Sequence, residues 1–435
     1  MTQKEFQRRR RQLMELMGEE SVAILPAAPV RYRNRDVEYP YRQDSDFYYL
    51  TGFPEPEAVM VLVPGRAHGE YILFCREKDE KMEIWHGKRA GQEGAVAEYG
   101  ADDSFPIDDI DDILPGLLED KTRVFYTMGA HPDFDQRVIG WVNRLRKLAR
   151  AGVHTPGEFI SLDHHLHEMR LFKSAAELKA MRKAAEISVQ AHIRAMQTCR
   201  PGLKEYQIAA ELNYVFQREG AAGPAYESIV GGGANACVLH YVTNRDTLRK
   251  GDLLLIDAGA EYDYYAADIS RTFPVSGRFS RAQRSLYDLV LEAQQAAIEA
   301  VKPGKHWNEP HEAAVRVLTE GMVKLGLLKG SVNRLIEQEK YRRFYMHRTG
   351  HWLGMDVHDV GDYKVDDEWR LLEPGMVLTI EPGLYVAGGD AKVPRKFWNT
   401  GIRIEDDVLV TKDGCEVLTE DAPKDPADIE AVMAG

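Results

Sequence analysis

The stretch GDLLLIDAGAEYDYYAADISRTF, residues 251–273, decides the fold of the second half of the chain. Its two apolar ends are typical of strands, and AEYD joins them. We predict a symmetric antiparallel hairpin centred between Tyr262 and Asp263, with Asp257 directly opposite Asp268 on one face. Two carboxylates placed in this way repel each other, and a bound cation would compensate them. The alternative is that Asp257 ends its strand in a turn and that Asp268 is solvated.

Two later strands each place a glutamate on a defined face. In MVLTIEPGLYV (376–386), strand alternation puts Glu381 on the face opposite two apolar side chains, just before a Pro-Gly turn. In GIRIEDDVLV (401–410), the same alternation sends Arg403 and Glu405 away from an apolar layer. The alternative for the second strand is an exposed ladder of Arg and Glu.

Histidines gather in FYMHRTGHWLGMDVHDVGDY (344–363), which contains His347, His351 and His358 among three glycines. The glycines, and the lack of a Glu directly after His347, distinguish this segment from the helical HExxH zinc motif. His240 adds a further imidazole in the apolar stretch ACVLHYV. A single histidine here would most often be a core or loop residue. Grouped imidazoles instead suit metal ligation, proton transfer and stabilisation of an oxyanion.

Together these segments supply five potential metal ligands: Asp257, Asp268, His351, Glu381 and Glu405. Four carboxylates and one imidazole carry more negative charge than one divalent ion needs. If they converge, oxygen-rich ligation suits two hard or borderline cations such as Mn²⁺. Paired metals make hydroxide from water at neutral pH, so the pattern indicates a hydrolase.

The motifs IDAG, DISRTFP, GHWLGMDVHD, LTIEPGLY and GIRIEDD, in this order, resemble the metal site of the pita-bread peptidases. That group holds methionine aminopeptidase, prolidase and aminopeptidase P. The stretch YPYRQDSDFYYLTGF (39–53), the junction HEMRLFKSAAEL (167–178) and the total length are similar to the bacterial aminopeptidase P family in particular. The similarity covers nearly the whole chain, and its motifs are specific.

The resemblance implies that the five ligands bind two Mn²⁺ ions, with Asp268 and Glu405 bridging them. A hydroxide between the ions would be the nucleophile, and Glu381 would carry its proton. The resemblance also implies the surrounding roles: His240, His347 and His358 for substrate and transition state, His358 at the oxyanion, Arg403 as support, and Tyr226 and Tyr385 as pocket walls. Arg348 and Thr349 depart from the family pattern, because many members have Gly and a small or apolar residue there.

Trp85 in EIWHGKRAG (83–91) is a large aromatic residue among charged neighbours, in a segment predicted to be an exposed loop. An exposed Trp is typical of interfaces, although a Trp packed within its own domain fits the sequence equally well. In aminopeptidase P the matching Trp reaches the active site of a neighbouring subunit. The resemblance therefore implies a homo-oligomer, a homotetramer, in which Trp85 helps to bind substrate.

The composition is that of a water-soluble globular enzyme: 435 residues, 44% hydrophobic, with a mean hydropathy of −0.41. A net charge of −13 argues against nucleic acid and anionic membranes as partners. No apolar run approaches the roughly 20 residues of a membrane span, and the N-terminus lacks the apolar region of a secretory signal. Four dispersed cysteines without CxxC spacing fit a reducing cytoplasm: Cys75, Cys199, Cys237 and Cys415.

The pattern along the chain predicts two domains, 1–172 and 173–435. The first alternates strands and helices as an α/β domain and begins with a helix whose Arg8–Arg11 run we expect to be solvated. Ser174 and Glu177 form a capping-box signal that opens the second, an α+β domain with a curved antiparallel sheet. Its strands are expected to include 236–242, and Asp406 and Asp407 are expected to be solvated.

These observations predict a dinuclear metallo-exopeptidase that removes the first residue from peptides with proline in the second position. The alternative within the same fold is a prolidase that accepts only Xaa-Pro dipeptides. A non-catalytic binding module of the same fold is a third possibility, disfavoured because such modules lose ligand residues and all five are present here.

Overall fold

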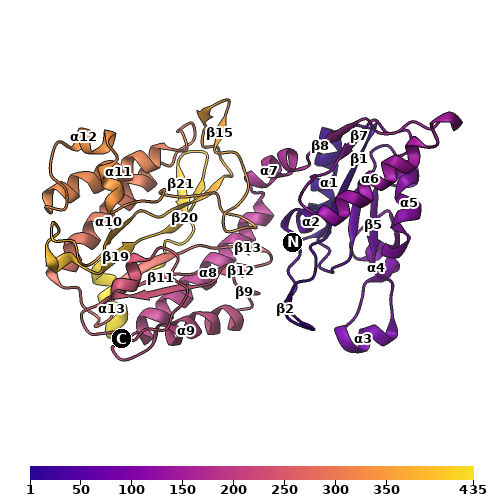
Figure 1. Ribbon diagram of the computed structural model, residues 1–435. Coiled ribbons are helices and arrows are strands. Elements are labelled where there is room, and N and C mark those ends of the chain that lie inside the picture. The colour runs from indigo at the N-terminus through magenta and orange to yellow at the C-terminus, as the bar shows by residue number, and fades with distance from the viewer. The chain divides into compact units, whose positions relative to one another are not determined.

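The computed structural model describes residues 1–435, which form two compact units, Met1–Met169 and Arg170–Gly435 (Figure 1). The predicted succession of an α/β domain and an α+β domain with an antiparallel sheet is confirmed. The domain limits predicted at 172 and 173 stay a prediction. No helix is long and apolar enough to cross a membrane.

The first unit is built on a six-stranded sheet in the order β6-β5-β4-β1-β7-β8. The pairs β1–β4 and β4–β5 are antiparallel, and the pairs β1–β7, β5–β6 and β7–β8 are parallel. The sheet strands are β1 (Ser21–Pro26), β4 (Val59–Leu62), β5 (Tyr71–Cys75), β6 (Asp103–Pro106), β7 (Arg123–Phe125) and β8 (Glu158–Ile160), and β2 (Tyr32–Asn34) and β3 (Val37–Glu38) form a separate hairpin. The helices are α1 (Gln3–Met17), α2 (Ser45–Thr51), α3 (Glu80–His86), α4 (Gly91–Ala97), η1 (Ile107–Asp109), α5 (Ile110–Leu118), α6 (Pro132–Arg146), η2 (Ala149–Ala151) and α7 (Asp163–Leu171).

Two expectations for this unit are wrong in part. Arg9 and Arg10 of α1 are buried, because their guanidinium groups donate to the carbonyl oxygens of Tyr49 (3.0 Å) and Leu50 (2.7 Å) at the end of α2. A row of four arginines on one helix cannot all face solvent, since it covers a full helical turn. The segment around Trp85 is the short helix α3 and not a loop.

The second unit combines antiparallel strands with two packed helix pairs, α8 with α9 and α10 with α11. Its helices are α8 (Ala175–Thr198), α9 (Glu205–Arg218), η3 (Gly233–Cys237), α10 (Arg281–Ala300), α11 (Glu309–Lys324), α12 (Val332–Glu337), η4 (Lys340–Arg343), η5 (Arg395–Phe397) and α13 (Pro426–Ala434). The strands before residue 300 are β9 (Gly223–Pro224), β10 (Ile229–Gly232), β11 (Leu253–Asp257), β12 (Ala260–Tyr262), β13 (Tyr265–Ala266) and β14 (Ser270–Pro274). The later strands are β15 (Lys364–Val365), β16 (Glu368–Trp369), β17 (Val377–Ile380), β18 (Gly383–Val386), β19 (Thr400–Arg403), β20 (Asp406–Val410) and β21 (Cys415–Val417).

Local signals fix the start of this unit. The Ser174 hydroxyl accepts from the backbone of Glu177, whose side chain accepts from the Ser174 backbone, so the predicted capping box opens α8. The strand predicted at 236–242 is wrong: the chain there forms η3 and turns. The glycines that precede it favour a tight turn over an extended run.

The hairpin register differs from the predicted one. The turn residues are Asp263 and Tyr264, both with positive φ (50° and 70°), as a type I′ hairpin turn requires. Asp257 therefore pairs with Ser270, and the prediction that it lies directly opposite Asp268 is wrong. A shift of two residues keeps each side chain on its face, so Asp268 remains on the side of Asp257 as a diagonal neighbour.

Candidate metal centre

Each candidate ligand lies at the end of a strand or in a loop beside one. Asp257 is the last residue of β11, and Asp268 lies just before β14. Glu381 follows β17, and Glu405 lies between β19 and β20. His351 lies in the loop before β17, where its carbonyl accepts from the backbone of that strand (2.9 Å). Strand ends are rigid but release side chains from the packed layer, so the five can face one point.

The ligand side chains converge in the structure. Three of them place ligand atoms within 4.8 Å of one another: Asp268, His351 and Glu405. His351 Nε2 lies 3.4 Å from Asp268 Oδ2 and 3.6 Å from Glu381 Oε1. The hydroxyl of Tyr226 lies within hydrogen-bonding distance of Oδ1 of Asp257 (2.5 Å) and of Oδ1 of Asp268. Tyr226 therefore joins the two hairpin carboxylates at the centre of the cluster.

The cluster holds more negative charge than the neighbouring cations compensate. Burial raises the pKa of Asp257 to about 6 and that of Glu381 to about 7. Burial and the neighbouring carboxylates hold the pKa of Glu405 well above its ordinary value. At Asp268 burial also raises the pKa, but the hydrogen bond and charge of His351 outweigh it and lower the pKa. Buried oxygen donors in excess of the available positive charge fit divalent cations that prefer oxygen.

Arg403 and Ser270 connect two of the candidate ligands, Asp257 and Glu405. Arg403 is buried and donates from Nη2 to Asp257 Oδ2 (2.6 Å), from Nε to Ser270 Oγ (2.8 Å) and from Nη1 to the Tyr385 hydroxyl (2.9 Å). Ser270 Oγ in turn donates to Glu405 Oε2 (2.7 Å). Partners of this kind set the orientation of metal ligands. Sequence reasoning missed Ser270, although strand alternation places it on the same face as Asp268, two residues earlier in the sequence.

His347 lies in the same network. Its Nε2 is 2.9 Å from the Tyr385 hydroxyl, and its Nδ1 is 3.7 Å from Glu381 Oε2. Burial, followed by the charge of Arg403, lowers the pKa of His347 to about 3. His347 is therefore a neutral imidazole beside the carboxylate of Glu381, a candidate ligand.

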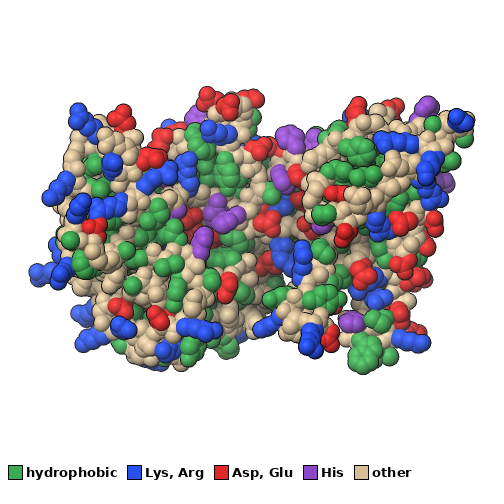
Figure 2. Space-filling model, viewed as in Figure 1, with side chains coloured by type: hydrophobic (Ala, Val, Ile, Leu, Met, Phe, Trp, Pro, Cys, Tyr) green, Lys and Arg blue, Asp and Glu red, His purple; other side chains and the backbone are tan.

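The two other histidines lie at the exposed edge of the cluster. The rings of His351 and His358 meet edge to face, with 4.4 Å between their centroids. Burial lowers the pKa of His358, and the charges of His351 and His240 add to the effect. His358 and His240 are both exposed. Figure 2 shows histidine side chains gathered on this face of the second unit.

The residues that depart from the family pattern have separate surroundings. Arg348 is exposed, whereas Thr349 is buried and its Oγ1 lies 2.5 Å from the Tyr345 hydroxyl and 2.8 Å from His311 Nδ1. The carbonyl of Thr349 accepts from the backbone of Glu381 (2.7 Å). Tyr345 and His311 were not predicted from the sequence, since neither carries a motif of its own.

Trp85 belongs to the other compact unit, and its side chain is 80% exposed. Its neighbour Ile84 is 82% exposed, and none of the residues of α3 is buried. With Met82, this short helix therefore presents three large apolar side chains to its surroundings.

Two family models match this chain. Residues 179–412 match metallopeptidase family M24, and residues 6–126 match the N-terminal domain of aminopeptidase P. The first match spans more than half of the chain and contains all five candidate ligands. The chain belongs to metallopeptidase family M24.

Similar proteins cover this M24 chain from end to end. The Xaa-Pro aminopeptidase of Escherichia coli (strain K12) is 48% identical over 434 residues, which is 100% of this chain and 98% of that protein. The Xaa-Pro aminopeptidase of Haemophilus influenzae is 43% identical over 100% of this chain and 98% of its own length. The solved structure of Pseudomonas aeruginosa aminopeptidase PepP matches with a TM-score of 0.99 and 62% identity, covering 100% and 98% of the two chains. The predicted pita-bread fold of the second unit is thereby confirmed.

Asp406 and Asp407 of the M24 unit are buried, so the expectation that they are solvated is wrong. Asp406 binds Arg271 Nη2 (2.7 Å) and Lys424 Nζ (2.6 Å). Both oxygens of Asp407 accept from the backbone N–H of Asp268 (3.2 Å each). These partners are distant in sequence, and the local charge pattern does not reveal them.

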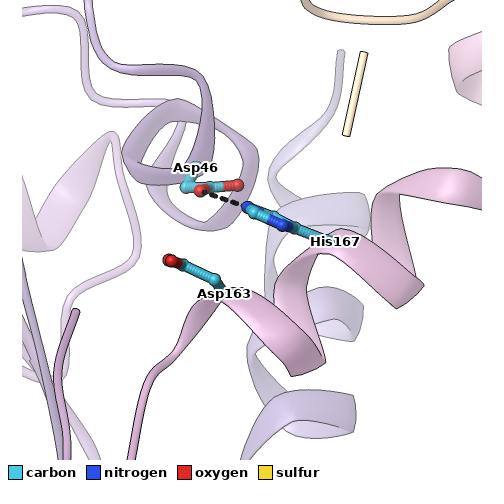
Figure 3. A group of neighbouring side chains, drawn as sticks. All are labelled: Asp46, Asp163 and His167. Atoms are coloured by element: carbon cyan, nitrogen blue, oxygen red, sulfur yellow. Dashed lines mark ion pairs between the residues drawn. The ribbon is translucent and has the colours of Figure 1, made fainter. Parts of the chain in front are cut away.

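A second group of possible metal ligands lies in the first unit of this M24 protein (Figure 3). Asp163 and His167 lie one turn apart on α7 and face Asp46 of α2, whose Oδ2 is 3.7 Å from His167 Nε2. Thr127 donates to Asp163 Oδ1 (2.5 Å). The three side chains are half-buried, and no motif in the sequence indicated them. Partly exposed carboxylates beside a histidine form ordinary ion pairs, so we assign this group no metal.

Proposed function

We propose that this chain is a metal-dependent exopeptidase that releases the N-terminal residue from peptides with proline in the second position. The observation that carries the proposal is the end-to-end similarity to two bacterial proteins named Xaa-Pro aminopeptidase. The relatives supply the substrate class. The converging carboxylates and histidines of the M24 unit supply a chemistry that can hydrolyse a peptide bond.

The proposed cofactor is a pair of divalent metal ions, Mn²⁺ in the first instance. The proposed ligands are Asp257, Asp268, His351, Glu381 and Glu405, with Asp268 and Glu405 as bridges. The uncompensated negative charge of this buried cluster supports the assignment, because hard and borderline cations prefer oxygen donors. When bound, the ions supply Lewis acidity and acidify the attacking water.

The side chains in and around the cluster have separate roles in proton transfer, oxyanion stabilisation and positioning. Glu381 lies between His351 and His347, where its carboxylate can take a proton from the attacking water and return it to the departing prolyl nitrogen. His358 lies beside His351 at the exposed edge, where it can donate a hydrogen bond to the developing oxyanion. Tyr385, held by Arg403, keeps the His347 ring in place.

An assay of Xaa-Pro dipeptides against Xaa-Pro-Xaa tripeptides with Mn²⁺ tests this proposal. The aminopeptidase cleaves the tripeptides, and cleavage confined to dipeptides would establish a prolidase instead. No cleavage of either peptide by metal-loaded protein would favour the non-catalytic module. The presence of all five ligands opposes that last alternative.

The proposal extends to assembly and location. We infer a homotetramer in which Trp85 closes the substrate pocket of a neighbouring subunit, supported by the exposure of Trp85 and Ile84 on α3. Such a pocket would admit only peptide N-termini. The four unpaired, dispersed cysteines support a cytoplasmic enzyme.

A further inference from the structure

The junction segment 167–178 contributes a buried ion cluster to the second unit. Arg170 Nη2 lies 2.6 Å from Asp359 Oδ1, and Lys173 Nζ lies 3.0 Å from Asp359 Oδ2. The side chains of Lys173 and Asp359 are each 1% exposed, and that of Arg170 is 3% exposed. Arg170 also binds Asp356, which is partly exposed. Two cations thus bind the buried carboxylate of Asp359, which lies in the loop that carries His351 and His358.

Asp359 closes the base of that loop. Its backbone N–H donates to the carbonyl of Trp352 (2.9 Å), which joins the two ends of the segment 352–359. His351 precedes Trp352, and His358 precedes Asp359. Asp359 therefore holds the backbone next to His358, whose ring meets the His351 ring at a centroid distance of 4.4 Å.

The loop is shaped to receive this cluster. A Cβ at Gly354 would lie 2.1 Å from Asp359 Oδ2 and 3.0 Å from Lys173 Cε, so only glycine leaves room for the pair. The carbonyl of Gly354 accepts from the backbone of Ala266 (2.8 Å), two residues before Asp268. The same loop thus contacts both the ion cluster and the segment that leads to a ligand.

Stability alone does not account for three buried charges. Desolvation offsets most of what a buried ion pair gains, and apolar residues of similar size often stabilise a protein as well or better. Ion pairs do impose direction, since the carboxylate must face both cations to be satisfied. That constraint passes to His358 through a single peptide bond.

We propose that Arg170, Lys173 and Asp359 are positioning residues that hold His358 in place for the reaction. The inference rests on the proposed function, in which His358 stabilises the oxyanion. A displacement of about 1 Å at such a group costs up to about 10²-fold in rate. The cluster acts on kcat through His358 and leaves the metal ligands bound.

A double-mutant cycle between Asp359→Asn and His358→Ala tests the proposal on the full-length, metal-loaded enzyme. Asp359→Asn should lower kcat on an Xaa-Pro-Xaa peptide by about 10-fold or more, with KM changed less and metal content unaltered. In the His358→Ala background it should have no further effect on kcat. An equal loss in both backgrounds would overturn the proposal.

A charge-balanced variant separates positioning from stability. Asp359→Asn leaves a buried cation without its partner, whereas Lys173→Met combined with Asp359→Asn removes one charge of each sign. The double variant should recover thermal stability but retain the low kcat. Recovery of kcat along with stability would show that the cluster only stabilises the fold.

Hydrogen exchange provides a readout that needs no substrate, so it remains decisive even if the protein cleaves no Xaa-Pro peptide. In the variant that combines Lys173→Met with Asp359→Asn, the backbone amides of residues 351–361 should exchange faster than in the parent. The amides of β11 and β14 should exchange at the parent rate. Unchanged exchange over 351–361 would overturn the proposal. The matched control is Glu416→Gln, which breaks the exposed pair with Arg182 on α8 and should alter neither exchange over 351–361 nor kcat.

Discussion

Glu405 and Asp406 are neighbours in sequence and are both buried, yet they belong to opposite electrostatic environments. Burial raises the pKa of Asp406, but the charges of Arg271 and Lys424 outweigh it and hold the pKa below its ordinary value. Burial raises the pKa of Glu405, and the carboxylates around it raise that pKa further. The two side chains contact different residues, Ser270 at Glu405 and Arg271 with Lys424 at Asp406, so they lie on two faces of which only the second supplies enough cations of its own.

The difference distinguishes a structural ion cluster from a binding site. Asp406 is satisfied by Arg271, Lys424, Gln294 and Thr419, all from this chain. The carboxylates around Glu405 share one buried arginine and one ligand histidine, which leaves negative charge for an external cation. Removing a carboxylate should therefore have opposite consequences on the two faces.

The largest effect is expected for Asp268→Asn on the ligand face, which is the face that carries the candidate ligands Asp257, Asp268, Glu381 and Glu405. The variant loses a bridging charge and at least one metal, and kcat should fall by about 10³-fold or more because metal ions contribute several kcal/mol to catalysis. The fold should survive, since asparagine keeps the size and shape of aspartate. Elemental analysis and steady-state kinetics check both statements. Two metals per chain in this variant would contradict the proposed ligation.

Asp406→Asn on the other face should show the reverse pattern. It leaves Arg271 buried without its carboxylate, and the free energy of unfolding should fall by about 3–5 kcal/mol. Metal content at low temperature should remain that of the parent. Denaturant unfolding and elemental analysis on the same sample provide the test. Loss of metal without loss of stability would mean that the two faces are not separate systems.

His358→Ala removes a neutral side chain next to the ligand face. It therefore tests whether a residue that leaves the charge of the cluster unchanged still contributes to catalysis. Both metals should remain bound, and kcat should fall by about 10²-fold if His358 donates to the oxyanion. KM should change less than kcat, because the interaction forms in the transition state. An unchanged kcat would reduce His358 to a structural residue.

Local pattern predicted the faces of the strands but not their long-range partners. Alternation placed Arg403 and Glu405 on one side, and Ser270 does join them there. The same pattern could not show that Arg271, 135 residues away, neutralises Asp406. The prediction of the hairpin register was wrong for a similar reason. Asp263 and Tyr264, which both have positive φ, form the turn one position later in the sequence than predicted. Burial of charge depends on partners that only the folded chain brings together.

Removal of metal should make the stability of the protein depend on the protonation of the carboxylates on the ligand face. The folded pKa values of Asp257 and Glu381 are raised, from 3.8 to about 6 and from 4.5 to about 7. These two groups stabilise the folded protein fully when the pH is below their pKa values in the unfolded chain. That stabilisation is lost as the pH rises through their pKa values in the folded protein. Metal-free protein should therefore lose stability relative to metal-loaded protein between pH 4 and pH 7. Asp406, whose pKa is lowered, contributes with the opposite sign and loses its stabilising effect at more acidic pH.

Thermal unfolding of chelator-treated protein across this pH range, with and without added Mn²⁺, measures the effect. Bound metal keeps the ligands ionised, so the metal-loaded protein should gain stability as the pH rises. Identical pH profiles for the two forms would show that the carboxylates of the ligand face are not held in excess of their cations.

The smallest effect is expected for Trp85→Ala, which should leave both charged faces intact. Trp85 is 80% exposed on a helix with no buried residue, so neither metal content nor the unfolding temperature should change. If Trp85 closes a neighbour's pocket, KM for Xaa-Pro-Xaa peptides should rise by about tenfold, the cost of truncating an interface aromatic residue. Light scattering on the same preparation reports the oligomeric state. A fully active monomer, or unaltered KM and kcat in Trp85→Ala, would place the whole substrate pocket within one chain.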